Sequence, residues 1–472
     1  MLENIKNVII GSGEGGKFLA WHLARSGEPA AVIERRMIGG SCPNTNCLPS
    51  KNEIWSATVA HLTRHANAFG VDIAEQDVSV DMVAVRQRKR DMVEGLIQLH
   101  LDNFRSSGTE LVMGNATLIG ERLLEVQLND GGTRTISADR LFLNLGTHAT
   151  IPAVPGLVEA QPMTHVDLLE LDRVPAYLVV VGGGYVGLEF AQAFRRFGSQ
   201  VTVLQHGSQL LSNQDDDVSS EISLALRDEG IEIVTSVDIK SVTGRSGLRV
   251  GIDLCTPDGD RRINASHILV AAGRTPNTAN IGLQTAGVEV NAQNYIRVND
   301  RLETSAENVW AIGECAGSPQ FTHASFDDFR VIRDNLAGGN RSTEDRLMPS
   351  CLFTDPQVAH IGLSEREAAQ QGMVVQTVRL PMKAVLRTRT LGETHGFMKA
   401  LIDADDKIVG FTMVGPAAGE VMFAVQLAMQ AQLPFTVFRD AIIAHPTMAE
   451  GLGTLFSSAK QSSKSNQQFA HT

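Results

Sequence analysis

Two stretches of the chain have the same order of apolar and glycine-rich segments. In the first, the apolar run NVIIG (residues 7–11) leads into a glycine-rich turn, an amphipathic segment over about 14–26, and a second apolar run over 30–34. The stretch 177–204 follows the same order. Strand, glycine turn, helix and strand within about 30 residues is the pattern of a Rossmann βαβ unit. The sequence therefore predicts two nucleotide-binding units.

Three further apolar segments extend this picture. Residues 83–104 carry apolar positions at helical spacing and are expected to form a helix. Residues 141–146 and 267–273 are apolar runs that end at glycine, so each is expected to be the strand that closes one nucleotide-binding domain. Pro152 and Pro155 mark the linker into the second domain.

The C-terminal part of the chain changes character. Residues 277–348 show short strands and loops, and the pattern after Pro349 alternates strands with one apolar helix over 419–432. Residues 461–472 are polar and rich in serine and glutamine, which predicts a disordered tail. The fold class is therefore expected to be α/β, with several domains.

Size and charge narrow the classes of function. At 472 residues the chain exceeds what one hydrophobic core usually supports. Its formal net charge of −12 disfavours nucleic acid and anionic membranes as partners. No apolar run has the length of about 20 residues that a membrane helix needs. The N-terminus lacks a basic segment before an apolar one, so no secretory signal is expected and the location is predicted to be cytoplasmic.

The first glycine turn has the residues that a dinucleotide requires. Gly11 permits the tight turn, Gly13 lets a pyrophosphate approach the backbone, and Gly16 lets the helix pack on the strand. The positive end of the following helix then faces the phosphates. Glu34 ends the next strand, where an acceptor for a ribose hydroxyl is needed. The combination favours a dinucleotide site over a structural turn.

The second glycine turn has Gly182, Gly184 and Gly187 at the same spacing. Its acidic position is taken by Gln205, which His206 follows. An acid there would favour NAD by repelling a 2′-phosphate, and an arginine would favour NADP. Gln205 does neither, so NADH and NADPH both stay open, with a slight lean towards NADPH because His206 can donate to a phosphate.

Between the two turns, the segment GGSCPNTNCLPSK contains Cys42 and Cys47. Residues five apart in a regular helix are separated by about 7.5 Å along its axis, whereas a disulfide needs Cα atoms within about 7 Å. A bridge therefore requires an irregular backbone. Pro43 breaks a helix, the two asparagines tolerate left-handed conformations, and Pro49 suits the first turn of a helix. The spacing favours a redox disulfide, with two unrelated buried thiols or half of a metal site as alternatives.

This cysteine segment resembles the redox-active motif of the pyridine nucleotide–disulfide oxidoreductases, the family of lipoamide dehydrogenase, glutathione reductase and mercuric reductase. Six further motifs agree with that family in the same order and extend the resemblance over nearly the whole chain. They are the first glycine turn with Glu34, GGGYVGLE (182–189), AAGRTPNT (271–278), AIGECAG (311–317), LFTDPQVAHIGLSEREA (352–368) and HPTMAE (445–450).

The resemblance implies roles for individual residues. Cys42 would be the interchange thiol that attacks the substrate, and Cys47 would face the flavin as the charge-transfer thiolate. Lys51 and Glu189 would form an ion pair beside the reactive edge of the flavin. Tyr185 would shield the flavin until nicotinamide arrives.

The resemblance also implies the cofactors FAD and NADH or NADPH, and a homodimer whose partner subunit supplies His445 as acid/base, oriented by Glu450. The expected cofactor-binding residues are Gly11, Gly13, Gly16, Glu34, Gly146, Gly313, Glu314, Gly182, Gly184, Tyr185, Gly187, Gln205, His206 and Gly273. No metal is expected, because His61 and His65 have the spacing of two ligands on a helix but no third ligand is evident.

The chain departs from the family pattern in three places. Asn46 stands where glycine usually precedes the second cysteine, Glu314 replaces the aspartate of the second flavin motif, and Gln205 replaces an acid. Mercuric reductases carry a C-terminal cysteine pair, whereas no cysteine follows Cys351 here. They also have tyrosine where this chain has His445.

The predicted architecture is two Rossmann-like domains, for FAD and for NAD(P)H, and a C-terminal α/β dimerisation domain. The predicted boundaries are 1–150 and 277–348 for the FAD-binding and central parts, 151–276 for NAD(P)H, 349–460 for dimerisation and 461–472 for the tail. The predicted function is reduction of a small-molecule or protein disulfide, or oxidation of a dithiol. The alternatives are a reductase of metal ions or reactive oxidants, and a flavin-bound redox sensor or component of a larger complex.

Overall fold

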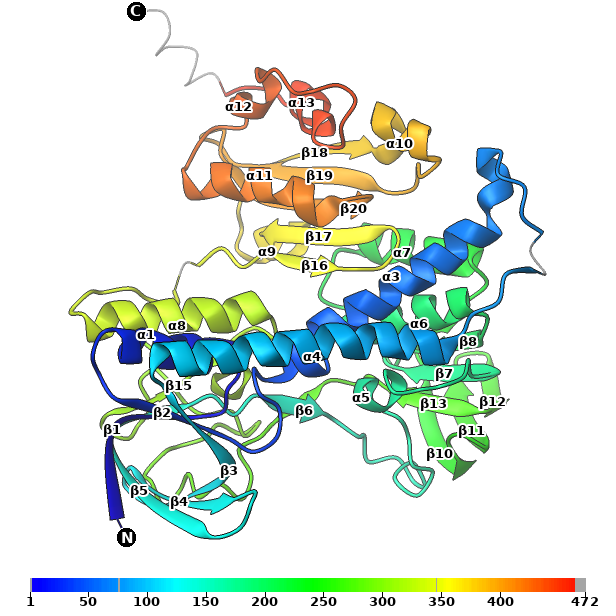
Figure 1. Cartoon of the computed structure of the whole chain (residues 1–472). Helices are drawn as coiled ribbons and strands as arrows, with labels where there is room; N and C mark the ends of the chain where they lie inside the picture. Colours follow the sequence, from blue (N-terminus) through cyan, green and yellow to red (C-terminus); the bar gives the residue numbers. More distant parts are fainter. Residues whose placement is uncertain (1, 75–76, 345, 463–472) are drawn as a thin grey trace, which may run out of the picture. The chain divides into compact units, whose positions relative to one another are not determined.

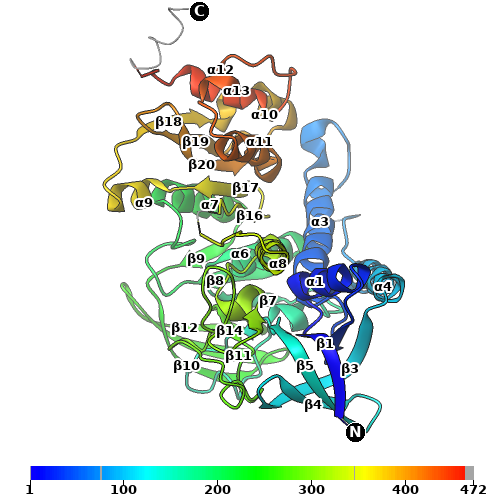
Figure 2. The same ribbon diagram turned by 90° about the vertical axis from the view of Figure 1, so that its left-hand side faces the viewer.

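The computed structural model describes residues 2–74, 77–344 and 346–462 (Figures 1 and 2). These residues fold into two compact units that each draw on several parts of the chain. Of the described residues, those within 2–152, 163–174 and 272–346 form unit 1, and those within 153–162, 175–271 and 347–462 form unit 2. Most of the tail predicted to be disordered lies outside the described residues. Among the described helices, none is both long and apolar enough to cross a membrane.

Unit 1 is built on a parallel sheet that positions the first glycine turn. Strand β1 pairs in parallel with β2 on one side and β5 on the other, β3 extends the sheet beyond β2, and β15 extends it beyond β5. Strand β4 joins β3 and β5 in antiparallel register. The strands are β1 (Leu2–Ile10), β2 (Ala30–Glu34), β3 (Glu110–Gly120), β4 (Leu123–Leu128), β5 (Thr133–Leu143) and β15 (Val309–Ala311).

Helices α1 (Glu14–Arg25), α4 (Met82–Ser107) and α8 (Thr322–Leu336) pack together beside this sheet (Figure 1). Helices α1 and α4 agree with the predicted segments. Helix α8 was missed, because residues 277–348 were expected to hold only short strands and loops. Its formation rests on packing, since Phe18 of α1 contacts Phe326 with ring centroids 4.8 Å apart and stacks on Phe329 at 6.1 Å.

Unit 2 contains the second glycine turn and an antiparallel sheet. The parallel sheet has the order β13-β7-β8-β9, and a separate antiparallel sheet has the order β10-β11-β12. The bounds are β7 (Tyr177–Val181), β8 (Gln200–Leu204), β9 (Glu232–Val234), β10 (Asp238–Arg245), β11 (Arg249–Thr256), β12 (Gly259–Ala265) and β13 (His267–Val270), with helices α6 (Tyr185–Phe197) and α7 (Asp216–Asp228). The strands and helix predicted over 177–204 form as expected.

The C-terminal part of unit 2 is a five-stranded sheet of order β16-β17-β20-β19-β18, with helix α11 against β17 and β20 (Figure 1). The prediction of one apolar helix after Pro349 was incomplete, because further short helices form in this part of the chain. The elements are β16 (Ser350–Leu352), β17 (Gln357–Gly362), β18 (Gln376–Pro381), β19 (Phe397–Ile402), β20 (Ile408–Gly415), α9 (Glu365–Gln370), α10 (Leu386–Leu391), α11 (Ala418–Gln430), α12 (Thr436–Arg439) and α13 (Glu450–Ser457).

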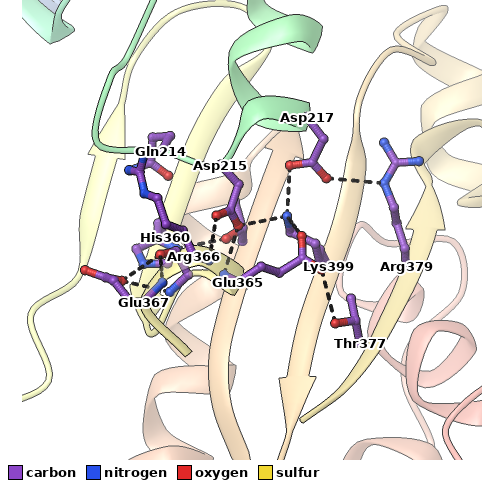
Figure 3. Close-up of polar contacts among 12 residues, drawn as sticks. Gln214, Asp215, Asp217, His360, Glu365, Arg366, Glu367, Thr377, Arg379 and Lys399 are labelled. Atoms are coloured by element: carbon purple, nitrogen blue, oxygen red, sulfur yellow. Dashed lines mark hydrogen bonds and ion pairs between the residues drawn. The ribbon is translucent and has the colours of Figure 1, made fainter. Parts of the chain in front are cut away.

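A partly buried ion cluster joins α7 to this sheet (Figure 3). The ammonium of Lys399 in β19 lies 2.9 Å from Asp215, 2.8 Å from Asp217 and 2.7 Å from Glu365. Asp215 immediately precedes α7, and Asp217 lies in its first turn, where a negative charge is favourable. We call these four residues the Lys399 cluster.

Candidate active site

The first glycine turn forms a cradle that only glycine can line. Gly11 has φ of +100°, and a Cβ there would lie 2.3 Å from the carbonyl oxygen of Asn144. A Cβ at Gly16 would lie 2.5 Å from the Asn144 amide nitrogen. Helix α1 begins after Gly13 with no side-chain cap from that residue, and of its first-turn amides Gly15 N donates to Ser325 Oγ at 3.1 Å, while the positive end of the helix faces the turn. These features fit the pyrophosphate of a dinucleotide.

Hydrogen bonds within the protein hold the Glu34 carboxylate in place. Its carboxylate accepts hydrogen bonds from Ser12 Oγ at 2.7 Å and Ser12 N at 3.0 Å. It also accepts from the amides of Arg36 at 2.8 Å and Met37 at 2.9 Å. The acid predicted from the sequence therefore lies at the wall of the site, with its orientation set by four protein donors.

A cavity of about 420 Å³ opens beside this turn within unit 1. This volume suits a cofactor-sized ligand, for which pockets of about 300–1,000 Å³ are usual. Its lining comes from distant parts of the chain and includes Gly11, Glu34, Cys42, Cys47, Gly146, His165 and Glu314. Most of the predicted flavin residues thus share one cavity with the predicted thiol pair, while Gly16 and Gly313 are not part of its lining.

Glu314 is held towards this cavity by two partners. Its Oε2 accepts from Arg274 Nε at 3.1 Å and from the hydroxyl of Thr147. The preceding Gly313 has φ of +71°, which sets the turn that presents the carboxylate. The extra methylene relative to aspartate is accommodated by these contacts.

Cys42 and Cys47 lie at a break between two helices. Cys42 is in the four-residue helix α2 (Ser41–Asn44), and Cys47 is the first residue of α3 (Cys47–Arg64). The asparagines do not use the left-handed backbone that they tolerate: Asn46 has φ of −120°, and the positive φ angles in this segment belong to Gly39 and Gly40. The break itself is the irregular backbone that the spacing requires.

The two sulfur atoms are electrostatically unequal. A hydrogen bond to Cys47, burial and the nearby Cys47 charge all raise the pKa of Cys42. Cys47 Sγ lies 3.2 Å from the hydroxyl of Thr322, the first residue of α8. Two adjacent thiols cannot both ionise cheaply, so the pair resists a second negative charge.

The second glycine turn lies in unit 2. Gly182 has φ of +114°, and a Cβ at Gly187 would lie 2.1 Å from the Gly182 carbonyl oxygen. Gln205 folds back onto this turn, with its Oε1 accepting from Gly183 N at 2.9 Å. His206 Nδ1 lies 3.1 Å from the carbonyl oxygen of Val237. The structure therefore places a neutral amide where the first turn has a carboxylate.

Other predicted residues have partners in their own unit. Glu189 is buried and accepts from Phe353 N at 2.9 Å, and the Tyr185 hydroxyl lies 3.3 Å from Ser350 Oγ. Burial raises the pKa of Tyr185. Lys51 lies on α3 in unit 1, so its ion pair with Glu189 stays a prediction.

His445 and Glu450 form a dyad in unit 2. The imidazole Nδ1 lies 3.0 Å from both carboxylate oxygens of Glu450, the first residue of α13. The His445 side chain is 59% exposed. A carboxylate on Nδ1 fixes the ring orientation, which is the geometry of an oriented acid/base.

Sequence reasoning missed three residues of the unit 1 cavity. Thr322 touches Cys47, His165 lies 2.7 Å from Asn46, and the Asn144 amide nitrogen donates to the Gly11 carbonyl at 3.1 Å. None belongs to a motif with a mechanism of its own. Asn144 could have been found from its place in the apolar run 141–146, which was predicted to be the strand that closes the domain.

Comparison with known proteins agrees with this geometry. The chain matches the family model described as pyridine nucleotide-disulphide oxidoreductase over residues 5–328, and that family's dimerisation domain over 348–456. It is 34% identical over 466 residues to the probable pyridine nucleotide-disulfide oxidoreductase RclA of Escherichia coli K12, covering 97% of this chain and 100% of the relative. It is 33% identical over 448 residues to the mercuric reductase of Shigella flexneri, covering 94% and 79%.

Solved structures give the same result. The chain superposes on the HOCl-induced flavoprotein disulfide reductase RclA of Escherichia coli with a TM-score of 0.86 at 32% identity, covering 96% of this chain and 100% of that one. For a Cu(II) complex of the same protein the TM-score is 0.88, with 97% and 100% covered.

Proposed function

The chain belongs to the pyridine nucleotide-disulphide oxidoreductase family, whose members use FAD and NAD(P)H, and on that premise we propose that Cys42 and Cys47 reduce a disulfide substrate. The observation that carries the proposal is the pair of coupled thiols in the wall of the dinucleotide cavity. FAD, when bound, carries the two electrons between the nicotinamide and the cysteine disulfide.

The electrons and protons balance through this chain's own residues. NAD(P)H and one proton convert the Cys42–Cys47 disulfide into two thiols and release NAD(P)⁺. Deprotonated Cys42 then attacks the substrate disulfide, which gives a mixed disulfide and a first leaving thiolate. Cys47 as thiolate attacks Cys42, which restores the internal disulfide and releases the second thiol.

The raised pKa of Cys42 explains why this site needs a base. A thiol that holds its proton is a poor nucleophile until a neighbour removes it. We assign that task to His445 of the partner subunit in a homodimer, which also protonates the first leaving thiolate. The family dimerisation domain over 348–456, which contains His445, supports this assignment.

The experiment compares the FAD-loaded parent with His445→Ala. NADPH and NADH consumption is measured against a panel of small-molecule and protein disulfides and against Hg(II) and Cu(II). His445→Ala is expected to lower turnover of the best disulfide by about 10²–10⁴-fold, because a positioned acid/base contributes about that much. Reduction of the flavin by NADPH should stay close to the parent rate, because that half-reaction does not use the imidazole.

The exposed His65 at the end of α3 supplies the matched control. His65→Ala is expected to retain the parent rate. If His445→Ala turns over its best disulfide at the parent rate, the acid/base role is wrong. If the parent reduces Hg(II) or Cu(II) faster than every disulfide tried, the second candidate, a metal-ion reductase that shares the thiol pair, replaces the first.

A further inference from the structure

Asn46 stands at the N-cap of α3 but does not cap the helix. Asparagine at this position usually accepts a hydrogen bond from an amide of the first turn. Here the Asn46 side chain makes no such bond. Its Oδ1 lies instead 2.7 Å from His165 Nε2 and 3.3 Å from the hydroxyl of Thr45.

His165 is rigidly placed to hold this amide. It is 7% exposed, and it is the first residue of helix α5 (His165–Leu168). Thr164 and Asp167 form a capping box at the N-terminus of this helix. Burial, and next the charge of Arg274, lower the pKa of His165 to about 4. The ring is therefore neutral at ordinary pH, and the Asn46 oxygen selects the tautomer in which Nε2 donates.

Because Asn46 does not cap α3, the backbone N–H groups in the first turn of this helix receive no hydrogen bond from its side chain. The backbone oxygen of Asn46 already accepts from Ser50 N at 3.0 Å, and Pro49 has no N–H. Leu48 N–H is thus the amide that a capping Asn46 side chain would take. Cys47 is the first residue of this 18-residue helix, where the positive end of the dipole stabilises a thiolate.

We propose that His165 is a positioning residue that draws the Asn46 side chain away from the α3 N-terminus and so keeps the positive end of that helix available to the Cys47 thiolate. This inference rests on the proposed function, because it takes Cys47 as the thiolate of the pair. It also explains how asparagine is tolerated beside the second cysteine.

The test measures the pKa of Cys47 in FAD-loaded protein carrying Cys42→Ser, so that one thiol of the pair remains. Long-wavelength charge-transfer absorbance and the rate of alkylation are followed against pH. His165→Leu frees Asn46 to cap Leu48, and we expect the pKa of Cys47 to rise by about one unit, a shift within what a helix terminus supplies. His165→Gln keeps an amide donor and should restore most of the parent value.

Two further variants separate positioning from stability. In an Asn46→Gly background no side chain is left to cap the helix, so His165→Leu should then have no effect on the pKa. Asp167→Asn weakens the cap of α5 without touching Asn46, and it should keep the parent pKa.

The outcomes distinguish this inference from the proposed function. If Cys42→Ser protein shows no charge-transfer absorbance at any pH, the thiol roles themselves are wrong. If the absorbance is present but His165→Leu leaves the pKa unchanged, the inference alone fails. It also fails if Asp167→Asn raises the pKa as much as His165→Leu, or if the effect persists in the Asn46→Gly background.

Discussion

The thiol pair of unit 1 and the Lys399 cluster of unit 2 are both crowded with ionisable groups, yet their pKa shifts have opposite meanings. In the Lys399 cluster burial works against the charges of Asp215 and Lys399, but the hydrogen bonds outweigh it. The pKa of Asp215 is lowered and that of Lys399 is raised. These two groups are stabilised in their charged forms, and the cluster holds α7 to the sheet.

At the thiol pair the shift disfavours the charged form. The contact with Cys47, followed by burial, raises the pKa of Cys42, so the pair tolerates one negative charge and resists a second. Groups that hydrogen bonds hold in their charged form contribute to the stability of the fold. A group whose charged form is disfavoured by a second ionisable group beside it is instead typical of a reactive site. The first three of the four predictions below test that difference, and the fourth concerns a neutral residue.

The largest effect is expected from the cysteines. Cys42→Ser and Cys47→Ser should each lower disulfide turnover by at least about 10⁴-fold, because removing a nucleophile that acts within a unit removes nearly all of its chemistry. The two variants should differ in absorbance, because only Cys42→Ser keeps the Cys47 thiolate and its charge-transfer band. Identical spectra would show that the roles of the two sulfur atoms are assigned wrongly.

A smaller effect is expected from Lys399→Met, and on stability. Removing one partner of a buried ion pair costs about 3–5 kcal/mol, and we expect about 3 kcal/mol because Asp217 and Glu365 reach solvent. Urea unfolding of parent and variant measures it. Arg379, 3.8 Å from Asp217 and half exposed, gives the control, since Arg379→Met should cost no more than about 1 kcal/mol.

The same cluster predicts a pH dependence whose sign follows from Asp215. Because the folded-state pKa of Asp215 is lowered, its contribution to stability is present above the ordinary carboxyl pKa and is lost as pH falls through the lowered value. The stability difference between parent and Asp215→Asn should therefore be full at neutral pH and shrink in acid. A difference that grows in acid would mean that the carboxylate is not stabilised by folding.

The smallest effect is expected at Gln205, the neutral residue at the second glycine turn. Gln205→Glu can keep the hydrogen bond to Gly183 N through one oxygen while adding a charge that repels a 2′-phosphate. The ratio of kcat/KM for NADPH over NADH should fall by about 10-fold, which is about 1.4 kcal/mol. A parent preference for NADH above about 100-fold would contradict the lean towards NADPH.

The sequence by itself determined the features that depend on near neighbours in the chain. The turn at Gly11, the strand that ends at Glu34, and the interrupted helix between Cys42 and Cys47 each follow from residue types within one short segment. The dyad of His445 and Glu450 also lies within one short segment, so its partners could be named before the structure was known.

Only the tertiary structure decided which distant residues meet. Thr322 reaches Cys47 because α8 packs on α1, although residues 277–348 were expected to hold only short strands and loops. His165 meets Asn46 across 119 positions, and Lys399 meets Asp215 across 184. Local pattern fixes which segments form and which face is apolar. The contacts that set a thiol's pKa or satisfy a buried charge depend instead on how those segments pack, because electrostatic and hydrogen-bond energies act over a few ångströms in space.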